Sequence, residues 1–307
     1  MKQFVVETAV VEAGGSMGFA GSYLKLARPK QWTKNGFVLA GVVFGGEALS
    51  AYPVFSALLA FVAFCALSGA VYAGNDVLDV EEDRKHPLKR RRPVASGVIS
   101  PRSALVFAVV LAAAGLALGF FVSLGVGIAG LAYLALQVVY TSFLKHTAIL
   151  DVMSISTGFV IRALAGVAAV EVRISPWLIV CTGLLTLFLG FSKRRHELAA
   201  LGERAVAHRK NLRDYSVPML DEMMNIMISA TIIAYTLYTF FEYENVHMMA
   251  SIPFVIYGVF RYMLLVHRDG GGNPDTLLLR DRPLQITLLL WLAVVMTVLY
   301  GLPMWND

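Results

Sequence analysis

The sequence predicts an all-α fold, a polytopic membrane helical bundle of about nine transmembrane helices with a cytoplasmic N-terminus. The 307 residues are 57% hydrophobic and only 15% charged, with a mean hydropathy of +0.66, which sets the chain apart from soluble domains. Apolar stretches close to the roughly 20 residues that cross a bilayer alternate with short polar segments. Lys and Arg residues gather in alternate connections, and this pattern orients the bundle.

Nine apolar stretches account for the expected helices. In chain order they are 36–51, 53–74, 103–122, 125–141, 149–170, 176–191, 223–241, 250–266 and 284–302. The tail 1–25 contains Glu7 and Glu12 and has no sustained apolar core, so it does not resemble a cleaved signal peptide. Residues 26–307 are therefore expected to form one transmembrane domain.

The distribution of basic residues predicts which side each loop faces. With the N-terminus in the cytoplasm, 23 of the 26 Lys and Arg residues lie on the cytoplasmic side, as the positive-inside rule requires. Arg173 lies outside, and Arg162 and Arg261 lie within spans. Every long polar loop is then cytoplasmic, while the outer connections are too short to build a site. We expect a multi-pass protein of the cell (inner) membrane whose chemistry faces the cytoplasm.

An acidic motif lies at the cytoplasmic end of the second stretch, where residues 74–93 read GNDVLDVEEDRKHPLKRRRP. If the helix continues through it, Asp76, Asp79 and Asp83 project from one face, with Asn75 beside them. Carboxylates on one stripe repel each other, and oxygen ligands at this spacing suit Mg²⁺ shared with a substrate phosphate. The alternative is a solvated loop whose basic flank fixes the topology.

Basic and tyrosyl side chains form a second group at the same membrane face. Lys89 and Arg92 follow the acidic motif and suit further phosphate oxygens. The next cytoplasmic turn, YTSFLKHTAILD, adds Tyr140, Lys145 and Asp151. A hydroxyl, an ammonium and a single carboxylate can complete a phosphate and cation site opposite the first motif. An ordinary helix cap with a lysine that fixes topology is the alternative.

Two more basic segments face the cytoplasm. In KLARPKQWTKN, residues 25–35, cations that include Lys34 surround Trp32, a pattern suited to an anionic lipid or to simple anchoring at the interface. Lys193 and Arg194 leave the sixth stretch in FSKRRHEL, where phosphate binding and surface anchoring are both open.

The spans themselves contain few polar groups. Arg261 lies about 10 Å from the inner end of its span by helical rise and can reach a headgroup phosphate. Arg162 lies about 16 Å along the helix from Asp151 and is expected to have a structural partner. Cys65 and Cys181 both fall inside spans and the histidines lack metal-ligand spacing, so neither a disulfide nor a zinc site is expected.

Taken together, these motifs resemble the UbiA superfamily of intramembrane prenyltransferases, and within it a branch that transfers phosphoribosyl groups. The resemblance covers nearly the whole chain from Leu26 onward. It is carried by RPKQWTKN, NDVLDVEEDRKHPLKRRRP, GFVIRALAG, KRRHEL and LLLRDRPLQ. Prenyl-transferring members carry a second acidic motif of the DxxxD type, whereas here Ile155 stands four residues after Asp151. This departure favours the phosphoribosyl branch.

The resemblance implies a UbiA-like fold and a Mg²⁺-dependent reaction. The enzyme would transfer 5-phosphoribose from phosphoribosyl pyrophosphate to a polyprenyl phosphate, releasing pyrophosphate and forming polyprenylphosphoryl-5-phosphoribose. The alternative is an aromatic prenyltransferase that uses a polyprenyl diphosphate. A transporter is disfavoured because we find no internal repeat and no second gate. Membrane lipids are expected partners and nucleic acid is not. The sequence leaves open whether the protein forms a homo-oligomer.

Roles for individual residues follow from that reaction. Three carboxylates, Asp76, Asp79 and Asp83, are assigned as catalytic residues that bind the metal. The donor substrate is assigned to Asn75, Lys89, Arg92, Tyr140, Lys145 and Asp151. The lipid phosphate is assigned to Lys34, Lys193, Arg194 and Arg261.

Overall fold

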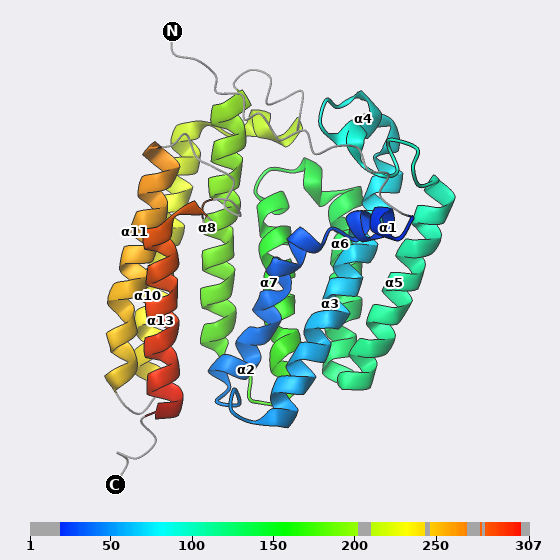
Figure 1. Cartoon of the computed structure of the whole chain (residues 1–307). Helices are drawn as coiled ribbons and strands as arrows, with labels where there is room; N and C mark the ends of the chain where they lie inside the picture. The colour runs from blue at the N-terminus through cyan, green and yellow to red at the C-terminus, as the bar shows by residue number, and fades with distance from the viewer. Residues whose placement is uncertain (1–18, 202–209, 243–245, 269–276, 278–279, 302–307) are drawn as a thin grey trace.

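The computed structural model describes residues 19–201, 210–242, 246–268, 277 and 280–301, and within these ranges the chain is helical with no strand (Figure 1). Eight of the described helices are long and apolar enough to cross a membrane. They are α3 (Ala51–Leu78), α5 (Pro101–Val122), α6 (Leu124–Ser142), α7 (Leu150–Val170), α8 (Pro176–Leu201), α10 (Val217–Phe241), α11 (Ile252–Arg268) and α13 (Arg282–Met296). The 3₁₀ helix η6 (Val246–Ser251) leads into α11, and the π-helix η7 (Thr297–Gly301) continues α13. The all-α membrane fold is confirmed, and the chain is a multi-pass membrane protein.

Several of the long helices begin at residues that cap their first turn. The side chains of Ser100, Ser123, Ser216 and Asp281 each accept a hydrogen bond from the backbone N–H three residues later. Such caps satisfy donors that the helix itself leaves unpaired. Proline in the first turn of α5, α10 and α13 adds a preset φ where no N–H is needed.

The predicted stretch 36–51 is not a regular α-helix. The chain instead forms the 3₁₀ helix η1 (Pro29–Leu39) followed by the short helix α2 (Ala40–Phe44), which pack against α3 and α7 (Figure 1). A 3₁₀ helix rises about 2.0 Å per residue, so η1 and α2 together extend about 30 Å, the thickness of the hydrocarbon layer. The prediction was wrong in start and helix type, and this segment is not among the eight described helices that are long and apolar enough to cross a membrane.

Two glycines explain how this segment fits against α7. A Cβ on Gly166 would lie 1.7 Å from the carbonyl oxygen of Val38, and one on Gly41 would lie 2.3 Å from the carbonyl carbon of Gly166. Only residues without a side chain allow backbones to approach so closely. The path of η1 and α2 is thus fixed by contact with α7 rather than by local helix propensity.

The helices divide into two packed groups. One core of buried side chains, centred on Phe64, Leu67 and Tyr133, joins η1, α3, α6 and α7. A second core, centred on Phe188 and Tyr262, joins α8, α10 and α11 to α13. Helices α7 and α8 pack against each other and connect the groups.

At the end opposite α4, the two groups also meet through α2. The Phe44 ring contacts Tyr238 of α10 and Trp291 of α13, with ring centres 6.2 and 6.0 Å apart. The Tyr300 hydroxyl lies 2.7 Å from the carbonyl oxygen of Val43 and accepts a hydrogen bond from Ala48 N–H. These contacts tie η7, the last helical segment that the structure describes, to α2.

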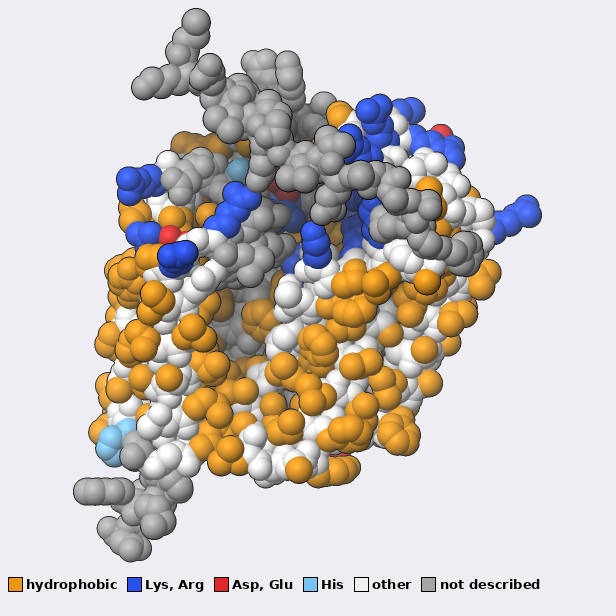
Figure 2. Space-filling model, in the orientation of Figure 1, with side chains coloured by type: hydrophobic (Ala, Val, Ile, Leu, Met, Phe, Trp, Pro, Cys, Tyr) orange, Lys and Arg blue, Asp and Glu red, His pale blue; other side chains and the backbone are white. Residues whose placement is uncertain are grey.

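The short elements and the basic side chains gather at the opposite end. Figure 2 shows Lys and Arg side chains at the end that carries α4, beside a broad apolar belt along the helices. The elements there include α1 (Phe19–Ala27), α4 (Val80–Lys85), η2 (Lys89–Arg91), η3 (Leu144–His146) and η5 (Lys210–Asp214). Polar chemistry therefore has one end of the bundle available to it.

Candidate functional site

The acidic motif is divided by a break between two helices. Helix α3 ends at Leu78, Asp79 caps it with φ −94° and ψ 10°, and α4 follows. Side chains of Asp76 and Asp83 are both 2% exposed, whereas that of Asp79 is 39% exposed. The continuous face of three carboxylates that the spacing predicted becomes a buried pair with a third carboxylate outside it.

Basic side chains neutralise the buried pair. Arg92 Nη1 lies 3.3 Å from Asp76 Oδ1 and 2.5 Å from Asp83 Oδ2, so one guanidinium joins both carboxylates. Arg28 also donates to Asp76 Oδ1, and Lys89 Nζ lies 4.0 Å from Asp83 Oδ1. Buried carboxylates require such partners because desolvated charge is costly. The predicted residues Asp76, Asp83, Lys89 and Arg92 are thus brought together.

Asp79 and Asn75 connect this pair to the loop between α6 and α7. Lys145, on η3, places its Nζ 3.9 Å from Asp79 Oδ1. Asn75 Oδ1 accepts a hydrogen bond of 3.3 Å from Thr141 Oγ1, near the end of α6. The structure therefore joins the first two predicted motifs at one site, although Asp79 and Lys145 form their own ion pair beside the buried carboxylates.

Asp151 belongs to a separate buried cluster. Its side chain is fully buried, and its Oδ2 lies 2.8 Å from Nε of Arg194, which is 1% exposed. Neither atom makes a well-aligned hydrogen bond at this contact, so the pair is held mainly by charge. Arg194 Nη1 also lies 2.6 Å from Glu197 Oε2, and Tyr140 interacts electrostatically with the same guanidinium. The predicted residues Tyr140, Asp151 and Arg194 are brought together here.

Tyr215 closes this cluster from the segment after η5. Its hydroxyl donates to Asp151 Oδ1 at 3.3 Å and accepts from the backbone N–H of Ile149 at 2.5 Å. Burial raises the pKa of Tyr215 to about 12, and the negative charge of Asp151 adds to the shift against the hydrogen bond from Ile149. The hydroxyl therefore stays protonated and continues to donate.

Three predicted cations remain, Lys34, Lys193 and Arg261. Lys34, on η1, interacts electrostatically with Tyr133 of α6, and Lys193 is partly buried on α8. Arg261 Nη2 lies 2.7 Å from Oδ2 of Asp281, the residue that caps α13. The hydrogen bond from Arg261 holds the pKa of Asp281 below its usual value. Arg261 thus has an acidic partner of its own at the start of α13.

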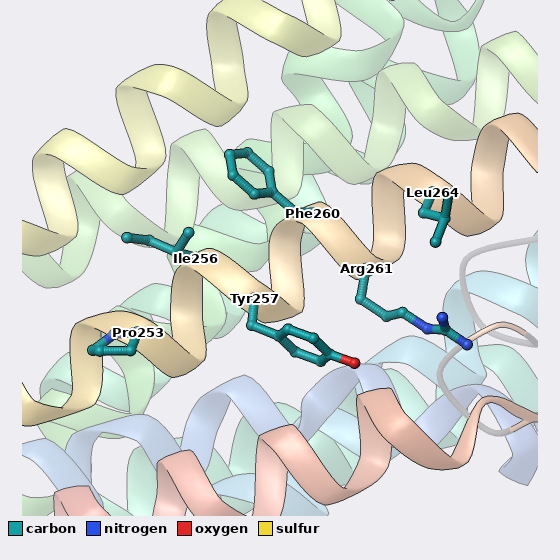
Figure 3. A pocket seen from close by; sticks show the side chains of 6 residues that line it. All are labelled: Pro253, Ile256, Tyr257, Phe260, Arg261 and Leu264. Carbon is teal, nitrogen blue, oxygen red and sulfur yellow. The ribbon is translucent and has the colours of Figure 1, made fainter.

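Arg261 lines a groove on α11 of about 530 Å³ (Figure 3). The groove is otherwise apolar or aromatic, with Pro253, Ile256, Phe260 and Leu264 among its lining residues. Figure 3 shows Tyr257 and Arg261 extending from the same side of α11, with Phe260 on the other. The surface therefore combines one cation with apolar side chains, as an amphiphile requires.

Arg162 has the structural partners that its depth predicted. Its Nε donates to Asn35 Oδ1 at 2.7 Å, Nη1 to the Gly158 carbonyl at 2.8 Å, and Nη2 to the Tyr133 hydroxyl at 3.1 Å. Asn35 in turn donates to Ser68 Oγ at 3.1 Å. Arg162 therefore fastens η1 to α3, α6 and α7 from within the bundle.

The carboxylates at the acidic motif fit Mg²⁺ only if substrate phosphates supply further ligands to the metal. Among the described residues, no group of three or more His, Cys, Asp or Glu side chains lies close enough to hold a metal ion. Mg²⁺, however, commonly binds one or two carboxylates together with substrate phosphates. Asp76 and Asp83 fit that requirement, provided that Arg28 and Arg92 transfer their contacts to the phosphates.

Three residues at this end of the bundle were not predicted as site residues. Arg28 lies in the motif RPKQWTKN, so its basic neighbourhood was visible in the sequence, but its pairing with Asp76 was not. Tyr215 follows a polar segment without any signal of its role. Asn211 of η5 is 1% exposed with neither side-chain amide atom hydrogen-bonded to the described protein. No pattern in the sequence distinguishes it, and η5 packs against η3, an element far away in the sequence.

Comparison with known proteins assigns the chain to a family. The sequence profile of the UbiA prenyltransferase family matches residues 36–280. A relative from Mycobacterium tuberculosis is 37% identical over 281 residues, covering 89% of this chain and 92% of the relative. One from Corynebacterium glutamicum is 33% identical over 295 residues, covering 93% and 89%. Both bear the name decaprenyl-phosphate phosphoribosyltransferase.

The fold agrees with that assignment. A UbiA homologue from Archaeoglobus fulgidus, solved with GPP and Mg²⁺ bound, superposes with a TM-score of 0.71 at 19% identity, covering 91% of this chain and 99% of the homologue. Family profile, relatives and fold agree over most of the length. The chain belongs to the UbiA prenyltransferase family and is an enzyme, a transferase similar to phosphoribosyltransferases of that family.

Proposed function

We propose that the enzyme transfers 5-phosphoribose from phosphoribosyl pyrophosphate to a polyprenyl phosphate with the help of Mg²⁺. The products are pyrophosphate and polyprenylphosphoryl-5-phosphoribose. Support comes from the relatives named decaprenyl-phosphate phosphoribosyltransferase over about nine-tenths of the chain. The arrangement of charge at the site supports the same reaction.

The observation that carries the proposal is the asymmetry between the two acidic positions. Asp76 and Asp83 form a pair linked by Arg92, whereas Asp151 is alone and neutralised by Arg194. A prenyl diphosphate bound between two metal-binding acidic motifs would need free carboxylates on both sides. Here only one side offers carboxylates for a metal. The cations Lys89, Arg92 and Lys145 lie beside them, so a donor with additional phosphate charge is favoured.

Each group at the carboxylate pair has a role in binding the donor. Asp76 and Asp83 would hold Mg²⁺, which supplies neutralisation of charge on the leaving pyrophosphate. Arg92 and Lys89 would move from the carboxylates to phosphate oxygens, since guanidinium and ammonium groups bind phosphates well. Lys145, with Asp79 at 3.9 Å, would approach the same pyrophosphate from η3.

The transfer itself exchanges one carbon–oxygen bond for another. The bond between the anomeric carbon and pyrophosphate breaks with its electron pair leaving on oxygen, while an oxygen of the lipid phosphate bonds to the same carbon. A phosphate acceptor is already ionised near pH 7, so the enzyme needs no general base. Cations placed around the leaving group are then the main contribution of the protein.

The acceptor would approach from the membrane side. We assign its phosphate to Lys34 and Lys193, and the groove on α11 with Arg261 offers apolar surface to its chain. Arg194 is reassigned from the lipid phosphate to neutralising Asp151, because two carboxylates already occupy its buried guanidinium. The protein would lie in the cell membrane with the basic end of the bundle facing the cytoplasm, in keeping with the positive-inside rule.

The direct test is transfer by the purified full-length protein in detergent. Radiolabelled phosphoribosyl pyrophosphate, polyprenyl phosphate and Mg²⁺ should yield a labelled lipid and free pyrophosphate. A parallel reaction with a polyprenyl diphosphate and an aromatic acid should yield nothing. The reverse result, prenylation of the aromatic acid without a labelled lipid phosphate, would establish the prenyltransferase alternative instead.

A further inference from the structure

A cavity of about 270 Å³ adjoins the buried carboxylates on the side of α1 and η2. Four of its lining side chains are cationic, those of Lys25, Arg28, Arg91 and Arg92. Asp76 is the one acidic residue that lines the cavity. A water molecule occupies about 30 Å³ in the liquid, so the space suits a phosphate ester better than a single ion. The cavity is therefore cationic beyond what its own carboxylate requires.

The four cations differ in how their charge is used. Arg28 and Arg92 both contact Asp76, and Arg92 also contacts Asp83. Within the ranges that the structure describes, neither Lys25 nor Arg91 forms an ion pair. Two positive charges at this cavity therefore lack an ion-pair partner in those ranges, and cations gathered without acidic partners repel each other unless an anion joins them.

Arg28 and Arg92 connect this cavity to the metal position. Their guanidinium groups contact the same oxygen, Oδ1 of Asp76, and Asp76, Arg28 and Arg92 all line the cavity. The backbone N–H of Arg92 donates to the Lys89 carbonyl at 2.9 Å, which holds Arg92 at the end of η2. A ligand with two phosphate groups could thus place one at Asp76 and Asp83 and the other beside Lys25 and Arg91.

We infer that this cavity binds the terminal 5-phosphate of the sugar donor, separately from its pyrophosphate. Lys25 and Arg91 would be the residues that distinguish the 5-phosphate, while Arg28 and Arg92 are shared between both ends of the donor. A prenyl diphosphate carries all its phosphate at one end and an apolar chain at the other, so it has no group for a second cationic cavity. The inference rests on the proposed function and identifies residues that select a phosphorylated sugar.

Binding of the two halves of the donor tests the inference without relying on turnover. Calorimetry on the full-length protein in detergent would measure ribose 5-phosphate and Mg²⁺–pyrophosphate separately. The variants Lys25→Gln and Arg91→Gln should each weaken ribose 5-phosphate roughly tenfold, the effect of losing one charge-assisted contact. Affinity for Mg²⁺–pyrophosphate should change by less than about twofold, because these cations lie away from the pyrophosphate.

A matched control is Arg102→Gln, an exposed cation at the start of α5 on the same end of the bundle that does not line the cavity. It should leave both affinities unchanged. Equal weakening of both ligands by Lys25→Gln and Arg91→Gln would overturn the inference, because the cavity would then be part of one general phosphate site. Unchanged ribose 5-phosphate binding in both variants, or none in the wild type, would overturn it as well.

Turnover adds an independent readout. The ratio of kcat/KM for phosphoribosyl pyrophosphate to that for ribosyl pyrophosphate, which lacks the 5-phosphate, should fall about tenfold in Arg91→Gln. An unchanged ratio would contradict the assignment. Failure of the proposed function would look different, because no labelled lipid would form from either donor while the selective loss of ribose 5-phosphate binding persisted.

Discussion

The carboxylate pair at Asp76 and Asp83 and the single carboxylate at Asp151 are both buried, yet their cations differ. Arg92, which joins the pair, remains 27% exposed, whereas Arg194, which neutralises Asp151, is 1% exposed. The first guanidinium borders a cavity, and the second is enclosed by two carboxylates. The first pairing can therefore be exchanged for a ligand at little cost, whereas the second is costly to separate.

This difference separates charge kept for chemistry from charge kept for structure. A buried ion pair adds little net stability compared with apolar residues, but removing one partner leaves an uncompensated charge. A partly exposed guanidinium can leave its carboxylate for a phosphate oxygen because water and substrate replace the lost contact. The first acidic position is expected to govern turnover, and the second to govern folding.

The largest effect is expected from the metal position. Removing Mg²⁺ with EDTA should abolish transfer, and Asp83→Asn should lower kcat/KM at least about 10³-fold, because charge on the leaving pyrophosphate would no longer be neutralised. Initial rates over a Mg²⁺ titration measure both effects. Glu82→Gln, an exposed neighbour on α4, serves as control and should retain full activity. A mild effect of Asp83→Asn would move the metal to other ligands.

The second acidic position should respond in stability. Arg194→Met leaves Asp151 buried without its cation and should lower the free energy of unfolding by about 3 kcal/mol. The double variant Asp151→Leu, Arg194→Met removes both charges and should recover most of that loss. Thermal unfolding in detergent measures both. If the double variant is stable but inactive, Asp151 takes part in the reaction. The distinction between a position that governs turnover and one that governs folding would then be wrong.

The fold was largely predictable, and its exception has a physical cause. Apolar length alone located eight spans, because the bilayer imposes a minimum length on any helix that crosses it. The segment containing η1 and α2 was not located correctly, since its 3₁₀ form depends on contact of Gly41 and Val38 with Gly166. Such contacts join residues more than a hundred positions apart and leave no local periodicity.

The candidate site was predictable in composition but not in grouping. Spacing placed Asp76, Asp79 and Asp83 on one face only if the helix continued, and no Gly or Pro marks the break at Asp79. Pairing of Asp151 with Arg194 was also hidden, because it joins α7 to α8 across the bundle. Arg162 was easier, since an arginine deep within a span almost always has a partner inside the protein.

An intermediate effect is expected at Asp79, which lies between the two cases. Its carboxylate is 39% exposed and pairs with Lys145 rather than with Arg92. Asp79→Asn should therefore reduce kcat/KM only about tenfold, by disturbing Lys145, and the effect should shrink at high salt. Comparison of initial rates at low and high ionic strength measures this. A loss equal to that of Asp83→Asn would show that all three carboxylates act as one metal site.

The smallest effect is expected at Tyr215, whose hydroxyl closes the cluster around Asp151. Tyr215→Phe removes one buried hydrogen bond and should lower the free energy of unfolding by about 1 kcal/mol. The folded-state pKa of about 12 lies above the value of about 10 for an unfolded tyrosine. The hydroxyl's contribution is therefore fully present below pH 10 and is lost only as the pH rises through about 12.

The difference in Tm between wild type and Tyr215→Phe should accordingly stay constant from pH 6 to pH 9, within the range of roughly three units where both tyrosine states are protonated. Thermal unfolding at several pH values measures it. The outcome to look for is a difference that varies in this range. That result would contradict the assignment of Tyr215 as a hydroxyl that stays protonated and donating across this range.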